Sequence, residues 1–356
     1  MRLRQRLGAK ARRLAGDRVR GLVRSATLGL GLRPRVNRAA SGRACYPGGR
    51  RAAVVLSADL ELAWGWRYAR VPVPLAYARQ RARQGRRNLQ ILLDLCDRYE
   101  LPVTWATVGH LFLGACGRTA GQTHPELPRV PHFDNELWSY RSGDWFDADP
   151  TSAGPNEPDW SAWYGPDLVE AILRRRVPHE IGCHTFSHLI FSDAFCPPAV
   201  AAAELSRCQE AAAAFALRLR SFAFPGNLAG NLPSLQSAGF AAYRFPTAYA
   251  LDLPRKDPLG MWQIPEGIWL EKVYASWTTA QQVSMVRRAL DAATKHGVVC
   301  GLWLHPETDP RNVDEVFAAV AADLADRRSE LWVTTMGELA RWFENHAVHA
   351  PTSPLR

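Results

Sequence analysis

The chain has 356 residues, of which 47% are hydrophobic and 22% are charged, a composition that is ordinary for a globular protein and excludes general disorder. Its seven cysteines form no CxxC pair, a scatter that fits a reducing compartment better than a disulfide framework. No apolar run approaches the roughly 18 residues that a membrane span needs, so we expect a cytoplasmic protein.

The net charge of +10 is concentrated at one end of the chain. Residues 1–50 hold thirteen Arg, one Lys and a single acidic residue, so they carry +13 and the rest of the chain carries −3. We predict a separate basic segment over 1–48, in which apolar residues recur at helical spacing, namely Leu3, Leu7, Ala11 and Leu14. A solvated tail and peripheral contact with an anionic membrane both fit this pattern. Nucleic acid is disfavoured, because no aromatic residue precedes Tyr46 to stack on bases.

From Arg51 onward, short apolar runs alternate with helical patterns, as in β/α units around a parallel sheet. The predicted strands are Ala52–Ser57, Val103–Val108, Glu180–Cys183, Phe222–Phe224, Ala241–Tyr243, Val298–Leu304 and Leu331–Thr334. Helices are expected over Arg87–Tyr99 and Pro198–Leu219, before the glycine cap Gly297, and after Thr335, which has capping-box spacing to Glu338. We therefore predict one α/β domain over 49–356, a distorted (β/α) barrel of about seven parallel strands.

Residues 118–166 do not fit this pattern, since they lack periodicity and are rich in Pro, Gly and Asp. A loop of this length in a compact domain is usually functional or disordered. Four tryptophans fall in it: Trp138, Trp145, Trp160 and Trp163. Either the segment forms a rim whose rings offer flat faces to a sugar, or it is an insertion that packs on the barrel.

A histidine pair follows the strand Glu180–Cys183 directly, in the run His184-Thr185-Phe186-Ser187-His188. Two histidines at i and i+4 would share one helical face and could chelate one metal ion. The position at the carboxyl end of a strand strengthens this interpretation, because β/α barrels place their sites there.

Two carboxylates, Asp59 and Glu61, end the first strand. Packing does not explain them, since buried acids need partners. One could hold a metal while the other takes a proton from an attacking water. Trp64 and Trp66 follow closely enough to line the same mouth as substrate-binding residues, although core packing is the alternative for at least one of them.

Two further strand ends carry polar groups. His305 ends an apolar strand and could protonate a leaving amine. The turn Phe224-Pro225-Gly226-Asn227 could point the backbone N–H of Gly226 or Asn227 at a developing oxyanion.

Taken in order, these four motifs resemble the polysaccharide deacetylases of the NodB-homology type over residues 51 to about 344. The resemblance implies that Asp59 is the catalytic base, that Glu61, His184 and His188 bind a divalent metal, expected to be Zn²⁺, and that His305 is the general acid. It further implies a hydrolase that removes N-acetyl groups from a carbohydrate, so the expected partner is an N-acetylated sugar.

Three positions depart from the family pattern. The family commonly has adjacent acids, whereas Leu60 separates the two here, so the roles of Asp59 and Glu61 could be swapped. The family's third motif usually carries an arginine just before its prolines, where this chain has Ala223, so Arg220 or Arg244 would have to substitute. We also count Arg244 among the substrate-binding candidates. The L-x-H motif has Trp303 at its leucine position. Two alternatives stay open: an amidohydrolase of a non-sugar amide on the same fold, and an inactive carbohydrate-binding member.

Overall fold

Strand β2 (Ala52–Leu60) lies in the middle of a curled sheet, and all of its residues are buried. The structure is a computed structural model, which describes residues 34–42, 44–151, 159–247, 249–271 and 277–346. Along one edge β2 pairs with β15 (Val299–Leu304). Along the other edge it pairs first with β16 (Leu331–Thr334) and then with β3 (Thr104–Thr107).

Within the described residues, ten strands form this sheet, in the order β12-β13-β10-β9-β8-β3-β2-β15-β14 with β16 beside β2. The remaining bounds are β8 Glu180–Cys183, β9 Ser221–Phe222, β10 Ala242–Pro246, β12 Arg255–Lys256, β13 Trp262–Glu266 and β14 Ile268–Trp269. Neighbours are parallel except for β12 with β13. The parallel strands therefore present their carboxyl ends on one side of the sheet.

One short chain segment connects β13, next to one end of this strand order, with β14 at the other end. Only Gly267 separates β13, which pairs with β10, from β14, which pairs with β15. The approach is close at Gly301 on β15, where an added Cβ would lie 2.1 Å from the Pro265 carbonyl oxygen. The sheet therefore curls toward a barrel, although the predicted count of about seven strands is not confirmed.

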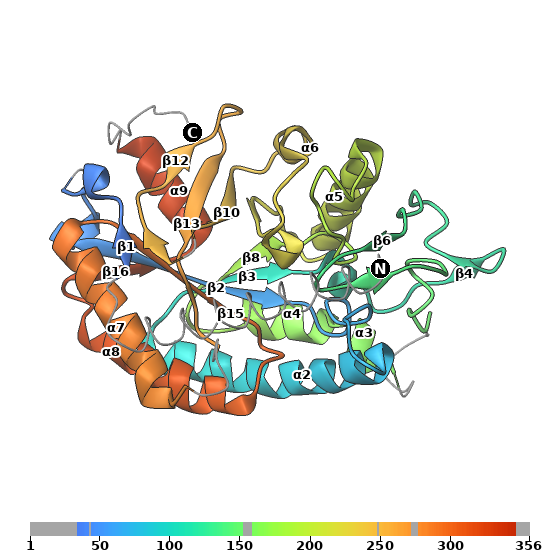
Figure 1. Ribbon diagram of the computed structural model, residues 1–356, viewed down its shortest axis with the longest axis horizontal. Coiled ribbons are helices and arrows are strands. Elements are labelled where there is room, and N and C mark those ends of the chain that lie inside the picture. The colour runs from blue at the N-terminus through green and yellow to red at the C-terminus, as the bar shows by residue number, and fades with distance from the viewer. Residues whose placement is uncertain (1–33, 43, 152–158, 248, 272–276, 347–356) are drawn as a thin grey trace, which may run out of the picture.

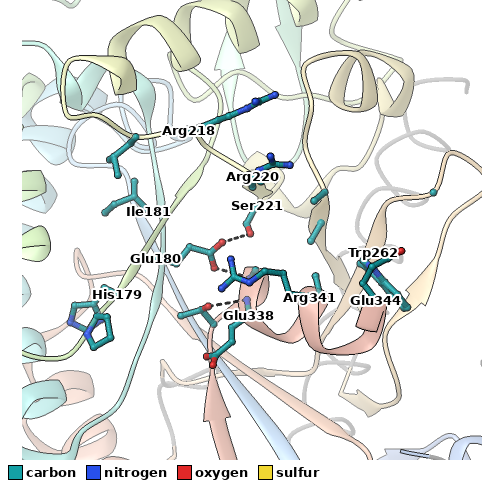
Figure 2. A pocket seen from close by; sticks show the side chains of 18 residues that line it. His179, Glu180, Ile181, Arg218, Arg220, Ser221, Trp262, Glu338, Arg341 and Glu344 are labelled. Carbon is teal, nitrogen blue, oxygen red and sulfur yellow. Dashed lines mark hydrogen bonds between the residues drawn. The ribbon is translucent and has the colours of Figure 1, made fainter. Parts of the chain in front are cut away.

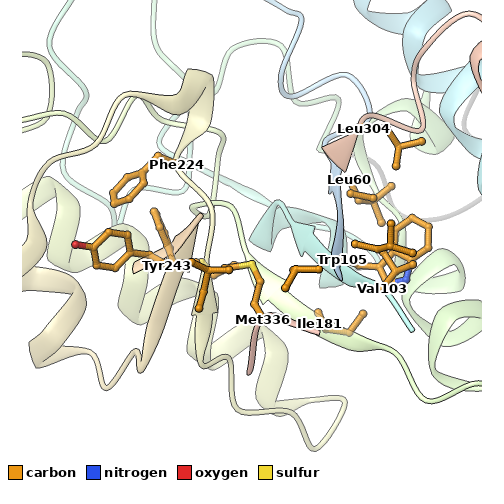
Figure 3. Close-up of a cluster of buried hydrophobic side chains, with 14 of the residues drawn as sticks. Leu60, Val103, Trp105, Ile181, Phe224, Tyr243, Leu304 and Met336 are labelled. Atoms are coloured by element: carbon orange, nitrogen blue, oxygen red, sulfur yellow. The ribbon is translucent and has the colours of Figure 1, made fainter. Parts of the chain in front are cut away.

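Helices cover the outside of the sheet (Figure 1). Their bounds are α2 Pro74–Tyr99, α3 Trp160–Trp163, α4 Pro166–Leu173, α5 Pro198–Ala213, α6 Leu232–Ser237, α7 Thr279–His296, α8 Ala318–Asp326 and α9 Met336–Asn345. Short helical turns η1 to η5 cover Arg38–Ala40, Pro47–Gly49, Gly109–Phe112, Pro225–Asn227 and Asn312–Phe317. Apolar side chains between the layers form one core, part of which Figure 3 shows around Leu60, Trp105 and Met336. Among the described residues, no helix is long and apolar enough to cross a membrane.

Most predicted elements are found, with shifted ends. Glu180–Cys183 and Leu331–Thr334 have the predicted bounds, and Gly297 caps α7 in the left-handed conformation. The first strand runs three residues beyond Ser57, and α2 begins at Pro74 rather than Arg87 because proline at its first turn suits a helix start. Helix α5 ends at Ala213 rather than Leu219. Strands β13 and β14 had no prediction.

The described residues of 118–166, called the rim segment below, fold into short elements that pack on the domain. The rim segment contains two hairpins, β4 (Arg118–Thr119) with β5 (Gln122–Thr123), and β6 (Phe133–Asp134) with β7 (Ser139–Tyr140). In Figure 1 these hairpins project beside α5. Three tryptophans of the rim segment, Trp145, Trp160 and Trp163, are buried in the core, as in an insertion that packs on the barrel. The fourth, Trp138, is only partly buried, as in a rim with accessible rings.

Residues 34–48, the end of the predicted basic segment, pack on the domain. Strand β1 (Arg35–Val36) pairs with β11 (Ala250–Leu251). Tyr46 is buried against Trp332 and Phe343, and its hydroxyl donates to the Gly297 carbonyl at 3.0 Å. The amphipathic pattern predicted over Leu3–Leu14 lies outside the described residues, and the division at residue 48 stays a prediction.

Candidate active site

The two carboxylates of the first motif point to the same side of the sheet. Alternate residues of a strand share a face, so Asp59 and Glu61 lie beside each other at the carboxyl end of β2. The strand stops where Leu62 takes a left-handed backbone conformation. The Glu307 carboxylate fixes this end, because its Oε1 accepts the N–H groups of Glu61 (3.1 Å) and Leu62 (2.6 Å).

The histidine pair lies on a loop and not on a helix, so the predicted helical face is wrong. Thr185 and His188 both have positive φ angles, 58° and 56°, which no α-helix allows. The turn is held by side chains instead. The Thr185 hydroxyl accepts from the Leu189 N–H at 2.8 Å, and Glu204 accepts from both the N–H (2.9 Å) and the hydroxyl (2.7 Å) of Ser187.

This loop still brings both rings to one point. The Nε2 atoms of His184 and His188 each lie 3.1 Å from Oε1 of Glu61, and all three residues are buried. His184 Nδ1 lies 2.9 Å from the Ala223 carbonyl oxygen, so it donates there and leaves the Nε2 lone pair for a ligand. Two imidazoles and a carboxylate are a common ligand set for Zn²⁺ and related ions, and these residues fit such an ion.

Asp59 is paired with Arg244 on β10. The guanidinium donates from Nη1 to Oδ1 at 2.6 Å and from Nη2 to Oδ2 at 2.5 Å, and both residues are buried. Burial alone would raise the pKa of Asp59, but the charges of Arg244, His184 and His305 and the hydrogen bonds from Arg244 together outweigh it, so the pKa is lowered. Asp59 is therefore ionised and held in one orientation.

His305 lies across from the histidine pair, with Nε2 at 3.6 Å from Oε1 of Glu61. Its Nδ1 is 2.6 Å from Oε1 of Glu271, which also accepts the His305 backbone N–H at 2.9 Å. Burial would lower the pKa of His305, but Glu271 and Glu61 raise it to about 10. Tryptophan rings surround the imidazole at 5.3 to 6.2 Å between ring centres: Trp66, Trp269 and Trp303.

Buried carboxyl groups outnumber cations at this end of the sheet. Among the described residues they are Asp59, Glu61, Glu266, Glu271 and Glu307, against Arg244, His305, Arg67 near His188 and Arg81 near Glu271. The excess of carboxyl groups affects two pKa values. Burial and the charge of Glu61 raise the pKa of Glu307 to about 8. Burial and the charge of Asp59 raise the pKa of Glu266 to about 7, although Glu266 contacts Arg244. A divalent cation at Glu61 would balance this negative charge.

The turn η4 borders the same space. Its Asn227 N–H donates to the Phe224 carbonyl at 2.9 Å. Of the two predicted oxyanion donors, the Gly226 N–H is therefore the one that does not make this hydrogen bond. An added Cβ at Gly226 would lie 2.7 Å from the ring of Trp138. Trp138 thus packs on the turn, and its ring centre is 5.7 Å from that of His188.

The predicted substrate-binding residues separate into three environments. Trp64 is buried, and its Nε1–H donates to the Trp163 carbonyl at 2.9 Å, so it is a core residue away from the mouth. Trp66 is partly exposed and lies against His305, so its role in binding substrate stays a prediction. Arg244 is engaged by Asp59 and Glu266, which matches the alternative of a substitute for the family arginine.

Sequence reasoning missed Glu266, Glu271 and Glu307, and it named Trp138 only as one of four tryptophans in 118–166. Glu307 follows His305 by two residues and could have been found as a second polar group at that strand end. Glu266 and Glu271 lie in segments without periodicity and had no signal.

A hollow of about 860 Å³ lies away from these residues, at the amino ends of β8, β9 and β13 (Figure 2). It is lined by His179, Arg220, Trp262 and Arg341, among others, and no residue of the candidate active site lines it. Arg220 is therefore excluded as the partner of Asp59.

No family model matches the chain, and no curated protein sequence matches it. Solved structures do. A protein assigned as a polysaccharide deacetylase from Mycobacterium smegmatis is 15% identical with a TM-score of 0.58, over 88% of this chain and 96% of that one. One so assigned from Pseudomonas aeruginosa PAO1 is 16% identical with a TM-score of 0.58, over 86% and 95%. Puue allantoinase is 14% identical with a TM-score of 0.59, over 86% and 94%. The chain therefore has the fold of polysaccharide deacetylases, as its motifs predicted, and the allantoinase shares that fold.

Proposed function

We propose that this protein is a metal-dependent hydrolase that removes an acyl group, N-acetyl from a carbohydrate, by cleaving a carbon–nitrogen bond. One observation carries the proposal. Glu61, His184 and His188 converge on one point, with an oriented carboxylate, Asp59, and a protonated imidazole, His305, beside it. Such a combination serves amide hydrolysis, which needs an activated water and a proton for the leaving amine.

Glu61, His184 and His188 are the residues that would hold the metal. A divalent ion of the zinc type supplies Lewis acidity when bound and makes water acidic enough to ionise near neutral pH. The contacts support Glu61 as ligand and Asp59 as base, because Glu61 lies against both rings while Asp59 is turned toward Arg244.

The remaining steps fall to side chains and one backbone amide. Asp59 accepts a proton from water as the oxygen adds to the acyl carbon, and the Gly226 N–H stabilises the oxyanion. His305 then donates its Nε2 proton to the leaving nitrogen while Nδ1 stays hydrogen-bonded to Glu271. The carbon–nitrogen bond breaks, and acetate and a free amine are released.

Aromatic walls favour a sugar over a smaller amide. Trp66 and Trp138 are partly exposed on two sides of the candidate active site, and Trp269 stacks on Trp303 with an interplanar angle of 12°. Flat apolar rings of this kind can stack on the faces of sugar rings. A non-sugar amide is the second candidate, since an allantoinase shares the fold at a similar TM-score.

Acetate release tests the proposal. Purified protein, with its metal content measured, is offered N-acetylated sugars in free, nucleotide-linked, lipid-linked and polymeric form, with allantoin and simple cyclic amides alongside. We expect acetate from at least one sugar form, and loss of that activity after chelation. Hydrolysis of the cyclic amides alone would select the second candidate, and ligand binding without turnover would select an inactive carbohydrate-binding protein.

A further inference from the structure

A second group of potential metal ligands lies under the rim segment and plays no part in the chemistry above. It consists of His110 on η3 and Cys116, His124 and Asp149 from the segment that follows. One side-chain atom from each lies within 4.8 Å of the others. His110, His124 and Asp149 are buried, and Cys116 is half-buried.

Both imidazoles are turned so that Nε2 faces the group. His110 Nδ1 lies 3.1 Å from the Trp163 carbonyl oxygen, and His124 Nδ1 lies 3.2 Å from Oε1 of Glu126. Each Nδ1–H therefore has an outside acceptor, as in histidines that ligate metals. Nε2 of His124 is buried, lies 3.5 Å from Oδ2 of Asp149 and makes no hydrogen bond. An unpaired buried nitrogen costs free energy, which a bound cation would recover.

The other distances also suit one small ion. Oδ2 of Asp149 lies 2.8 Å from both His110 Nε2 and Cys116 Sγ, and that sulfur is 3.7 Å from His110 Nε2. Four ligands at zinc bond lengths stand about 3.3–3.7 Å apart at the corners of a tetrahedron. The two 2.8 Å pairs would need to open by less than about 1 Å to reach this geometry, and the 3.7 Å pair already fits it.

We propose that His110, Cys116, His124 and Asp149 bind a structural Zn²⁺ ion, separate from the ion of the candidate active site. Two nitrogens, a thiolate and a carboxylate fill all four positions, so no open position is left for a substrate. Cys116 loses its thiol proton to solvent on binding, and the Tyr164 hydroxyl stays as a donor to Oδ1 of Asp149 at 2.6 Å. Apolar rings enclose the site, with Trp64, Phe146 and Phe186 within 5.5 Å of a ligand ring.

The ion would fasten the rim segment at its base. Three of the four ligands come from residues 116–149, and the same segment carries Trp138 to the active site. Trp138 donates from Nε1 to the Gly65 carbonyl at 2.9 Å, and Trp145 donates from Nε1 to the Ser187 hydroxyl at 2.7 Å, next to His188. The ion would thus hold the wall of the active site without touching the reacting groups.

Metal stoichiometry on the full chain tests this proposal. We expect two zinc ions per chain in the wild type and one in Cys116→Ala and in His124→Ala. Cys45→Ala is the matched control, since Cys45 is exposed and outside the group, and it should keep both ions. His184→Ala should lose the other ion only. Reconstitution with Co²⁺ adds a signature, because a near-ultraviolet thiolate band should persist in His184→Ala and vanish in Cys116→Ala.

X-ray absorption at the zinc edge of the wild type covers the case in which the variants do not fold. Sulfur in the zinc shell is expected, since the candidate active-site ligands Glu61, His184 and His188 contain none. A shell of only nitrogen and oxygen, or one zinc per chain that survives both Cys116→Ala and His124→Ala, would overturn the proposal. The cluster would then be a hydrogen-bonded network alone.

Discussion

Arg244 on β10 holds Asp59 on β2 through two hydrogen bonds of 2.6 and 2.5 Å, although the residues are 185 positions apart. Arg244 takes the place of the arginine that the third motif of polysaccharide deacetylases usually carries, at the position where this chain has Ala223. Both residues point into the curled sheet, so the guanidinium reaches the carboxylate from a neighbouring part of the wall. In the proposed mechanism the base is therefore oriented by an arginine that comes from β10.

Replacing Arg244 tests this pairing. Arg244→Lys keeps the charge but loses the two-point contact, so we expect kcat to fall about 10²-fold with the protein still folded. Arg244→Ala leaves the Asp59 carboxylate buried without a partner, and unfolding free energy should drop by about 3–5 kcal/mol. Steady-state kinetics and urea unfolding measure the two effects. Equal kcat for Arg244→Lys and the wild type would mean that the two-point contact with Arg244 is not needed to orient Asp59.

The roles of Asp59 and Glu61 can be separated by metal content. Asp59→Asn should keep the active-site ion and lose about 10²–10⁴-fold in rate, because a general base is removed. Glu61→Gln should lower the affinity for that ion, because its Oε1 lies 3.1 Å from both His184 and His188. Elemental analysis and kinetics on the same preparations decide the matter. If Asp59→Asn is the variant that loses metal, the roles are swapped.

Glu271 should set the alkaline limit of activity. It raises the pKa of His305, and the acid form of His305 is lost as pH rises through that pKa. In Glu271→Gln this carboxylate charge is gone, so the pKa falls and the alkaline limb of kcat/KM moves to lower pH. Glu271→Asp, which keeps the charge, is the control. An unchanged limb in Glu271→Gln would show that another group limits the rate there.

Trp138 should contribute to substrate binding rather than to chemistry. Trp138→Ala removes a partly exposed ring beside His188 and Gly226, and we expect KM for a carbohydrate to rise about 10-fold, in line with 1–1.5 kcal/mol of lost aromatic contact. The neighbouring Leu137 is exposed, so Leu137→Ala is a matched control with no expected effect. A fall in kcat at constant KM would place Trp138 in the positioning of His188 instead.

The sequence predicted the candidate active-site residues better than the residues that support them. Asp59, Glu61, His184, His188 and His305 each follow a short apolar run, and the parallel sheet brings such positions together without further information. Arg244 and Glu271 could only be placed by knowing which strands are neighbours. The histidine pair was placed on a helix because its i, i+4 spacing fits one, whereas Thr185 and Glu204 stabilise a left-handed turn. The His110 group has spacings of 6, 8 and 25 residues, which match no local pattern.

The basic segment at the start of the chain is expected to contact an anionic membrane surface. Residues 1–33 lie outside the described structure and hold nine Arg, one Lys and Asp17, a net charge of +9. We expect the full chain to bind vesicles that contain acidic lipid, and binding to weaken with salt, because charges are screened within about 8 Å at physiological ionic strength.

Deletion should stop at residue 33 and not at 48, because β1 pairs with β11 and Tyr46 is buried against Trp332. The shortened chain should lose vesicle binding and keep its turnover of a small water-soluble substrate, since every proposed catalytic group follows Ser57. Vesicle sedimentation at low and high salt, with neutral vesicles as the control, measures the first effect. Full-length protein that stays in the supernatant at low salt would leave the segment as a solvated extension.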